Sequence, residues 1–141
     1  MKNIIKDIRE KIEILEKKIL SYDDKRDSVI QLNYIDLFNG SNEEKLKRII
    51  EQLESYNINI MPTSKERQII RSAIIAELGE HGFAYWIRIR SMTENYDLQE
   101  QYDKYNNLLI QRHKNTMTFG AIVNRYKQAI DRFNENNKLH I

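Results

Sequence analysis

The chain contains no cysteine, one proline and four glycines among its 141 residues. Without cysteine, disulfides and thiolate zinc sites are excluded, which suits a reducing compartment, so we expect a cytoplasmic protein. The scarcity of proline and glycine removes the residues that most often interrupt helices. Long apolar runs are also missing, because no stretch approaches the ~18 apolar residues of a membrane span. We expect neither a signal peptide nor association with a membrane.

An excess of charge of one sign is lacking too. The chain has 23 basic and 21 acidic residues, a net charge of +2, and this balance does not by itself indicate a nucleic-acid binder. Apolar residues make up 40% and charged residues 31%, which is enough for a buried core beneath a solvated surface. The length fits one domain, or one domain with a helical arm.

Apolar residues recur at helical spacing along nearly the whole chain, so we predict an all-α protein. It should consist of an N-terminal coiled-coil-like helix or helical hairpin followed by a compact helical bundle. The first helix has apolar residues in alternating steps of three and four, the a/d pattern of a coiled coil. Those expected to mediate self-association are Ile5, Ile8, Ile12, Leu15 and Ile19. This seam spans about three heptads, so it can pair with a second copy or fold back onto the next helix.

Capping patterns indicate where further helices begin. We predict a second helix, or a continuation of the first, over residues 24–38, with Gly40 as its stop. S/T-x-x-E capping boxes at 41–44 and 63–66 predict the next two helix starts. Three more helices are expected: one directly after Gly82, one holding Leu98 to Leu109, and a last one from near Thr118.

The best break in the pattern is the segment 57–61, because Pro62 disfavours helical geometry in the residue before it. We therefore expect three parts. They are a helical arm for oligomerisation or docking at 1–56, a compact helical domain at 63–134 and a frayed tail at 135–141.

Residues that could carry chemistry are sparse. The three histidines, His81, His113 and His140, fall in two loops and the tail, without the i, i+4 spacing of a helical metal site. The sequence also lacks a glycine-rich phosphate loop and a G-x-S-x-G nucleophile motif. We therefore expect a protein without enzyme activity, metal, cofactor or small-molecule substrate.

A set of basic residues lies close in sequence to several tyrosines. The basic residues are Arg88, Arg90, Arg112, His113, Lys114, Arg125 and Lys127. The tyrosines are Tyr85, Tyr96, Tyr102 and Tyr105. Cations that follow phosphates and aromatic rings that stack on bases would suit a binder of single-stranded nucleic acid. Interleaved acids between Glu94 and Asp103 would weaken the positive field, so the alternative is that these are ordinary solvated and core residues.

The order of residues from Ala76 to Lys127 is more specific than helical spacing alone requires. Its marker residues are Gly82, Trp86, Ser91, Tyr96, Tyr102 and the run MTFGAI at 117–122. In this order the stretch resembles the second type of primase C-terminal domain, a helical module of primases of phages, plasmids and other mobile elements. An aromatic core is expected from the same region, with Gly120 allowing close helix contact. Its members would be Trp86, Tyr96, Tyr102, Phe119 and Ile122.

The resemblance implies a replication-associated module that links or positions a primase or helicase, and it transfers no catalytic residue. Our first hypothesis is an accessory protein of phage or mobile-element DNA replication that binds single-stranded DNA or a replication protein. The alternative is a small helical inhibitor or scaffold that acts by protein–protein interaction through a coiled-coil homodimer.

Overall fold

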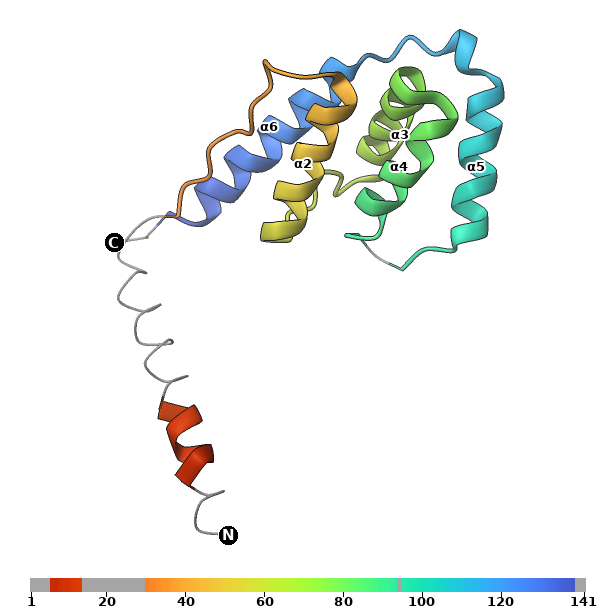
Figure 1. Ribbon diagram of the computed structural model, residues 1–141. Helices are drawn as coiled ribbons and strands as arrows, with labels where there is room; N and C mark the ends of the chain where they lie inside the picture. Colours follow the sequence, from red (N-terminus) through yellow and green to blue (C-terminus); the bar gives the residue numbers. More distant parts are fainter. Residues whose placement is uncertain (1–5, 14–29, 94, 139–141) are drawn as a thin grey trace. The chain divides into compact units, whose positions relative to one another are not determined.

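The computed structural model describes residues 6–13, 30–93 and 95–138. Within these ranges the regular elements are all helical and no strand occurs, so the predicted all-α class is confirmed. The named helices are α2 (Asn42–Tyr56), α3 (Ser64–Leu78), α4 (Phe83–Arg90), α5 (Leu98–Ile110) and α6 (Phe119–Asn136), as Figure 1 shows. Short 3-10 helices lie at Gly79–Gly82 and Arg112–Lys114. No helix among the described residues combines the length and apolarity needed to cross a membrane.

The chain divides into two units, and the larger one, Leu32–Phe133, contains helices α2 to α5 and most of α6. The other unit comprises Met1–Gln31 and Asn134–Ile141, and its described helical residues are 6–13 and the last turn of α6 at 134–136. The break predicted at 57–61 is present, but it is a tight connection inside the larger unit. Ile60 and Met61 of this connection are fully buried, which places the helices before and after it around one core.

The predicted helix over 24–38 is wrong in its described part, because residues 30–37 have no regular structure. Residues 32–38, here called the strap, bond instead to distant helices. The Ile35 N–H donates to the Tyr126 hydroxyl at 2.8 Å, and the Gln52 side-chain amide donates to the Asn33 carbonyl at 2.9 Å. These long-range partners satisfy backbone groups that a local helix would otherwise pair.

Both predicted helix starts are confirmed by an N-cap hydrogen bond. The Glu44 N–H donates to the Ser41 hydroxyl at 3.1 Å, and the Glu66 N–H donates to the Thr63 hydroxyl at 3.2 Å. Each hydroxyl supplies an acceptor to one of the N–H groups that the first turn of a helix leaves unpaired. These two caps fix where α2 and α3 begin, and the left-handed Asn57 after Tyr56 marks where α2 ends.

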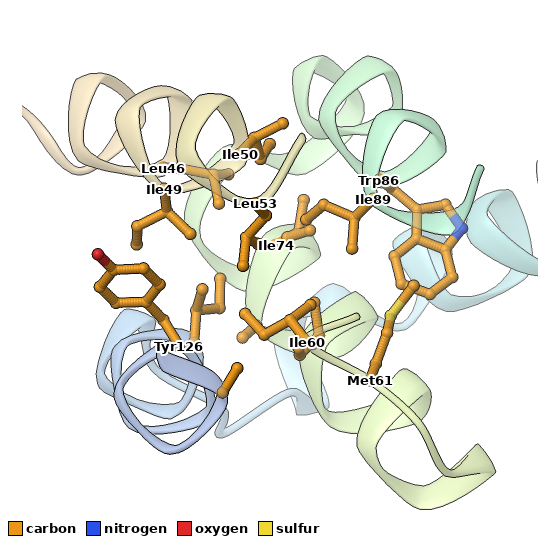
Figure 2. Packing of buried hydrophobic residues seen from close by; sticks show 14 of the residues in the cluster. Leu46, Ile49, Ile50, Leu53, Ile60, Met61, Ile74, Trp86, Ile89 and Tyr126 are labelled. Carbon is orange, nitrogen blue, oxygen red and sulfur yellow. The ribbon is translucent and has the colours of Figure 1, made fainter. Parts of the chain in front are cut away.

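The core gathers side chains from α2, the connection after it, α3, α4 and α6 (Figure 2). Trp86 is completely buried, and its indole N–H donates to the side-chain oxygen of Gln101, a buried polar residue of α5, at 3.3 Å. Of the predicted aromatic core, Phe119 and Ile122 are also buried, whereas Tyr102 is 47% exposed and Tyr96 is half-buried.

The close helix contact expected at Gly120 occurs at Gly82 instead. A Cβ at Gly120 would meet only the Thr118 hydroxyl, at 3.4 Å. A Cβ at Gly82 would lie 2.5 Å from a methyl group of Ile74 and 2.6 Å from the Tyr105 hydroxyl. Gly82 therefore sets how closely the start of α4 approaches α3 and α5.

Candidate functional site

A cleft of about 940 Å³ opens between α3, α4 and α5. Its volume lies in the range of about 300–1,000 Å³ that is usual for ligand sites. The charged residues that line it are four cations and two acids. They are Arg67, Arg71, Arg90, Lys104, Asp97 and Glu100. The cleft is therefore a positively charged concavity on a protein whose overall charge is nearly balanced.

The inner wall of the cleft combines a buried indole with a partly buried arginine. The Arg71 guanidinium lies 5.7 Å from the centroid of the Trp86 ring, within reach of a cation–π interaction. Burial lowers the pKa of Arg71, but an arginine pKa is high enough for the side chain to stay charged. Its Nε is buried and has no hydrogen-bond partner among the described residues. A desolvated cation without an anionic partner is costly, and a bound anion would offset that cost.

Arg67 precedes Arg71 by one helical turn on α3. Like charges at i, i+4 repel and cost a helix roughly 0.2–0.5 kcal/mol. Neither guanidinium has a hydrogen bond or an ion pair with any residue that the structure describes. The two side chains thus form a pair of uncompensated donors that face one cleft, an arrangement suited to oxyanions such as phosphate.

The outer wall of the cleft is formed by the end of α4 and the start of α5. The Arg90 guanidinium lies 5.5 Å from the Tyr96 ring centroid and hydrogen-bonds to Thr93. Asp97 caps α5 by accepting from the backbone N–H groups of Gln99 and Glu100, at 2.9 and 3.3 Å. The Asp97 carboxylate is therefore the N-cap of α5, and its negative charge is partly offset by these N–H groups at the positive end of the helix dipole.

Lys104 is the fourth cation of the cleft. Its ammonium forms an ion pair with Glu100 at 2.8 Å, one helical turn earlier on α5, and both side chains are more than half exposed. Such exposed pairs contribute about 0–1 kcal/mol, so they exchange readily for another anion. The lysine can therefore contact a ligand at the mouth of the cleft.

The seven basic residues predicted as a nucleic-acid site do not gather in one place. Only Arg90 lines the cleft, together with Tyr96. Arg88 forms an ion pair with Glu54 of α2. Arg112 donates to the Ala76 carbonyl at 2.9 Å and so completes the C-terminal end of α3.

The other predicted basic residues lie elsewhere in the larger unit. His113 and Lys114 are exposed on the 3-10 turn at Arg112–Lys114. Arg125 and Lys127 are on α6, where the Lys127 ammonium lies 5.6 Å from the Tyr34 ring centroid. These basic residues lie near tyrosines in the sequence, but in the folded protein they do not form one surface.

The sequence prediction missed Arg67, Arg71 and Lys104. A usable signal was present, since the four-residue spacing of the two arginines places them on one helix face. What the spacing could not show was that α5 lies opposite this face and closes the cleft. Within the described residues, no group of three His, Asp or Glu side chains is placed to hold a metal ion.

Only part of the predicted self-association seam can be described. Ile8 and Ile12 lie one turn apart on the helical stretch 6–13 and are 52% and 47% exposed. Ile5, Leu15 and Ile19 lie outside the described residues.

Searches of protein-family models, of curated proteins and of solved structures found no match to this chain. The chemical character of the site is that of a cationic cleft with one partly exposed aromatic ring, Tyr96, at its edge.

Proposed function

We propose that this chain is a non-catalytic nucleic-acid-binding protein that holds a single strand in the α3–α4–α5 cleft. The observation that carries the proposal is the pair Arg67 and Arg71 inside the cleft, whose guanidinium groups have no ion pair with any described residue. A phosphodiester group brings one negative charge and two acceptor oxygens, and a guanidinium matches both. One phosphate on this pair would relieve the repulsion between the arginines and offset the cost of the partly buried Arg71 charge.

A single strand suits the cleft better than a duplex. The cations lie within a concavity between three helices, and Tyr96 stands at its edge with part of its ring accessible. An unpaired strand can place its backbone inside while a base stacks on the tyrosine, which is how sequence-tolerant binders of single strands work. A duplex keeps its bases stacked inside the helix, so Tyr96 would add nothing to its binding.

The biological setting that we propose is DNA replication of a phage or another mobile element. This part rests on the resemblance of residues 76–127 to the second type of primase C-terminal domain. Such a module would hold template or primer strand near a primase or helicase without carrying catalytic residues. The cleft supports this setting, because its wall includes Trp86 and Tyr96, two of the residues that carry the resemblance.

Fluorescence anisotropy with a labelled single strand and a labelled duplex, each at two salt concentrations, tests the proposal. We expect salt-dependent binding that favours the single strand. Arg67→Ala should weaken it several-fold and lower the slope of log K against log salt by about 0.7, the value for one lost contact to a single strand. Lys114→Ala removes one exposed cation outside the cleft and is the matched control. Equal losses for both variants, or no binding by the unaltered protein, would contradict the proposal.

The second candidate function is a scaffold or inhibitor that works through a coiled-coil homodimer. It is favoured by Ile8 and Ile12, two apolar side chains on one exposed face of the 6–13 helix. Sedimentation of the full chain against an Ile8→Lys, Ile12→Lys double variant tests it. A dimer that the double variant converts to a monomer supports this function, whereas a monomer in both samples excludes it.

A further inference from the structure

Phe38 stands out among the large apolar residues, because 94% of its surface is exposed. It is nevertheless held on a fixed turn. The Asp36 carboxylate accepts from the backbone N–H groups of Phe38 and Asn39, at 2.9 and 3.1 Å. The Arg48 guanidinium of α2 donates to the Asp36 and Asn39 carbonyls, at 2.6 and 2.7 Å. The backbone that carries the ring is thus held in place, which lowers the backbone entropy lost when a partner binds the ring.

Gly40 makes this arrangement feasible. Its φ of +93° lies in the region that glycine adopts readily and other residues rarely do. A Cβ at this position would also lie 2.6 Å from the Arg48 Nη2, the atom that donates to Asn39. The glycine is therefore required where the guanidinium crosses the turn that carries Phe38.

Phe38 borders a groove of about 500 Å³ between the strap and the start of α6. The apolar part of its lining includes Leu37, Phe119 and Val123. An exposed aromatic ring next to an apolar groove is typical of an interaction surface, where a partner's apolar side chain fills the groove and covers the ring.

The charges around the groove indicate the chemistry of the partner. Lys45 and Lys127 line it, and Asp36 is its one carboxylate among the described lining residues. The two Asp36 oxygens are already taken by Phe38 and Asn39, and these hydrogen bonds hold the pKa of Asp36 below its usual value. The two ammonium groups outnumber this one carboxylate, so the groove keeps an excess of positive charge and an acidic segment would be complementary.

We propose that this strap groove binds an acidic segment of a protein partner. A large apolar side chain of that segment enters the groove beside Phe38, and flanking carboxylates contact Lys45 and Lys127. Nucleic acid fits less well, because the groove has an apolar floor and lacks a paired set of guanidinium groups like that of the cleft. This inference goes beyond the proposed function and uses a different surface.

The test measures binding of the full-length protein to a panel of fluorescein-labelled peptides. Each contains Phe or Leu residues one helical turn apart between Glu and Asp residues, and each has a twin with Lys in place of the acids. We expect saturable binding of the acidic peptides only. Phe38→Ala should weaken it by about tenfold or more, as truncation of an aromatic anchor does. Ile110→Ala, which shortens another side chain that is 77% exposed, should leave it unchanged.

A charge reversal provides the second arm. Lys45→Glu should weaken acidic-peptide binding several-fold. Lys47→Glu is the matched control, because it makes the same change two residues further along α2, outside the groove lining. The proposal is overturned if no acidic peptide binds, or if Phe38→Ala and Ile110→Ala have equal effects. It is also overturned if a single-stranded oligonucleotide displaces the peptide competitively, or if Phe38→Ala dissociates a dimer, since nucleic acid or a second copy would then be the occupant. Loss of nucleic-acid binding in Arg67→Ala with intact peptide binding separates the two surfaces.

Discussion

Tyr126 connects the strap to the helical core, and Tyr126→Phe is the substitution that tests this connection. The hydroxyl accepts the Ile35 N–H at 2.8 Å and donates to the side-chain oxygen of Gln52. Removing it leaves both partners unpaired in partly buried positions. With about 1 kcal/mol for each, the free energy of unfolding should fall by about 2 kcal/mol. For a unit of this size the melting temperature should drop by roughly 10 °C.

Urea denaturation of the unaltered protein and the variant measures this loss. Tyr102→Phe is the matched control, because the Tyr102 ring is 47% exposed and lies outside the strap contacts. Hydrogen exchange adds a local measurement, in which the Ile35 amide should lose protection in Tyr126→Phe and keep it in Tyr102→Phe. If the two variants were equally stable and the Ile35 amide equally protected, the strap would not be held by this hydroxyl, and the account of the groove beside it would fail.

Three further predictions concern packing, pH and capping. Gly82→Ala should overpack the core and lower the free energy of unfolding, measured with urea, by about 1–3 kcal/mol. Gly120→Ala, whose Cβ would contact only the Thr118 hydroxyl at 3.4 Å, should be neutral or stabilising. Burial raises the pKa of Tyr105, so its folded form holds its proton more tightly than the unfolded form. The contribution of Tyr105 to stability should therefore be constant below about pH 10 and be lost above it. In urea titrations stability should fall above that pH, and Tyr105→Phe should flatten the fall. Thr63→Ala should cost about 1 kcal/mol by removing the α3 cap, measured by the same urea assay.

The sequence predicted helix starts well where the residues that determine them lie within one short segment. Ser41 and Thr63 cap helices through the N–H groups three residues later, so the pattern and the bond lie in one short segment. The strap shows the opposite case. Residues 32–38 have apolar residues that also fit a helix, but their backbone partners are Tyr126 and Gln52, which no local pattern reveals.

The site was harder to predict than the fold for the same reason. Arg67 and Arg71 share a helix face by their spacing, yet only the packing of α5 against α3 turns that face into a cleft wall. Arg112 has a structural role that its sequence context did not indicate. The basic loop predicts a phosphate contact for it, and the structure adds that its guanidinium donates to the Ala76 carbonyl near the end of α3.

The residues that carry the primase-domain resemblance have unequal roles, and this affects what the resemblance can support. Gly82 sets a helix contact and Trp86 is completely buried. The helix packing therefore requires these two residues whether or not the protein binds a ligand. Tyr96 differs, because its ring lies at the edge of the cleft with Arg90 beside it. Replacement of Tyr96 by Leu should therefore weaken binding of a single strand while leaving stability nearly unchanged. A loss of stability without a loss of binding would instead place Tyr96 with the structural residues, and the resemblance would then support the architecture alone.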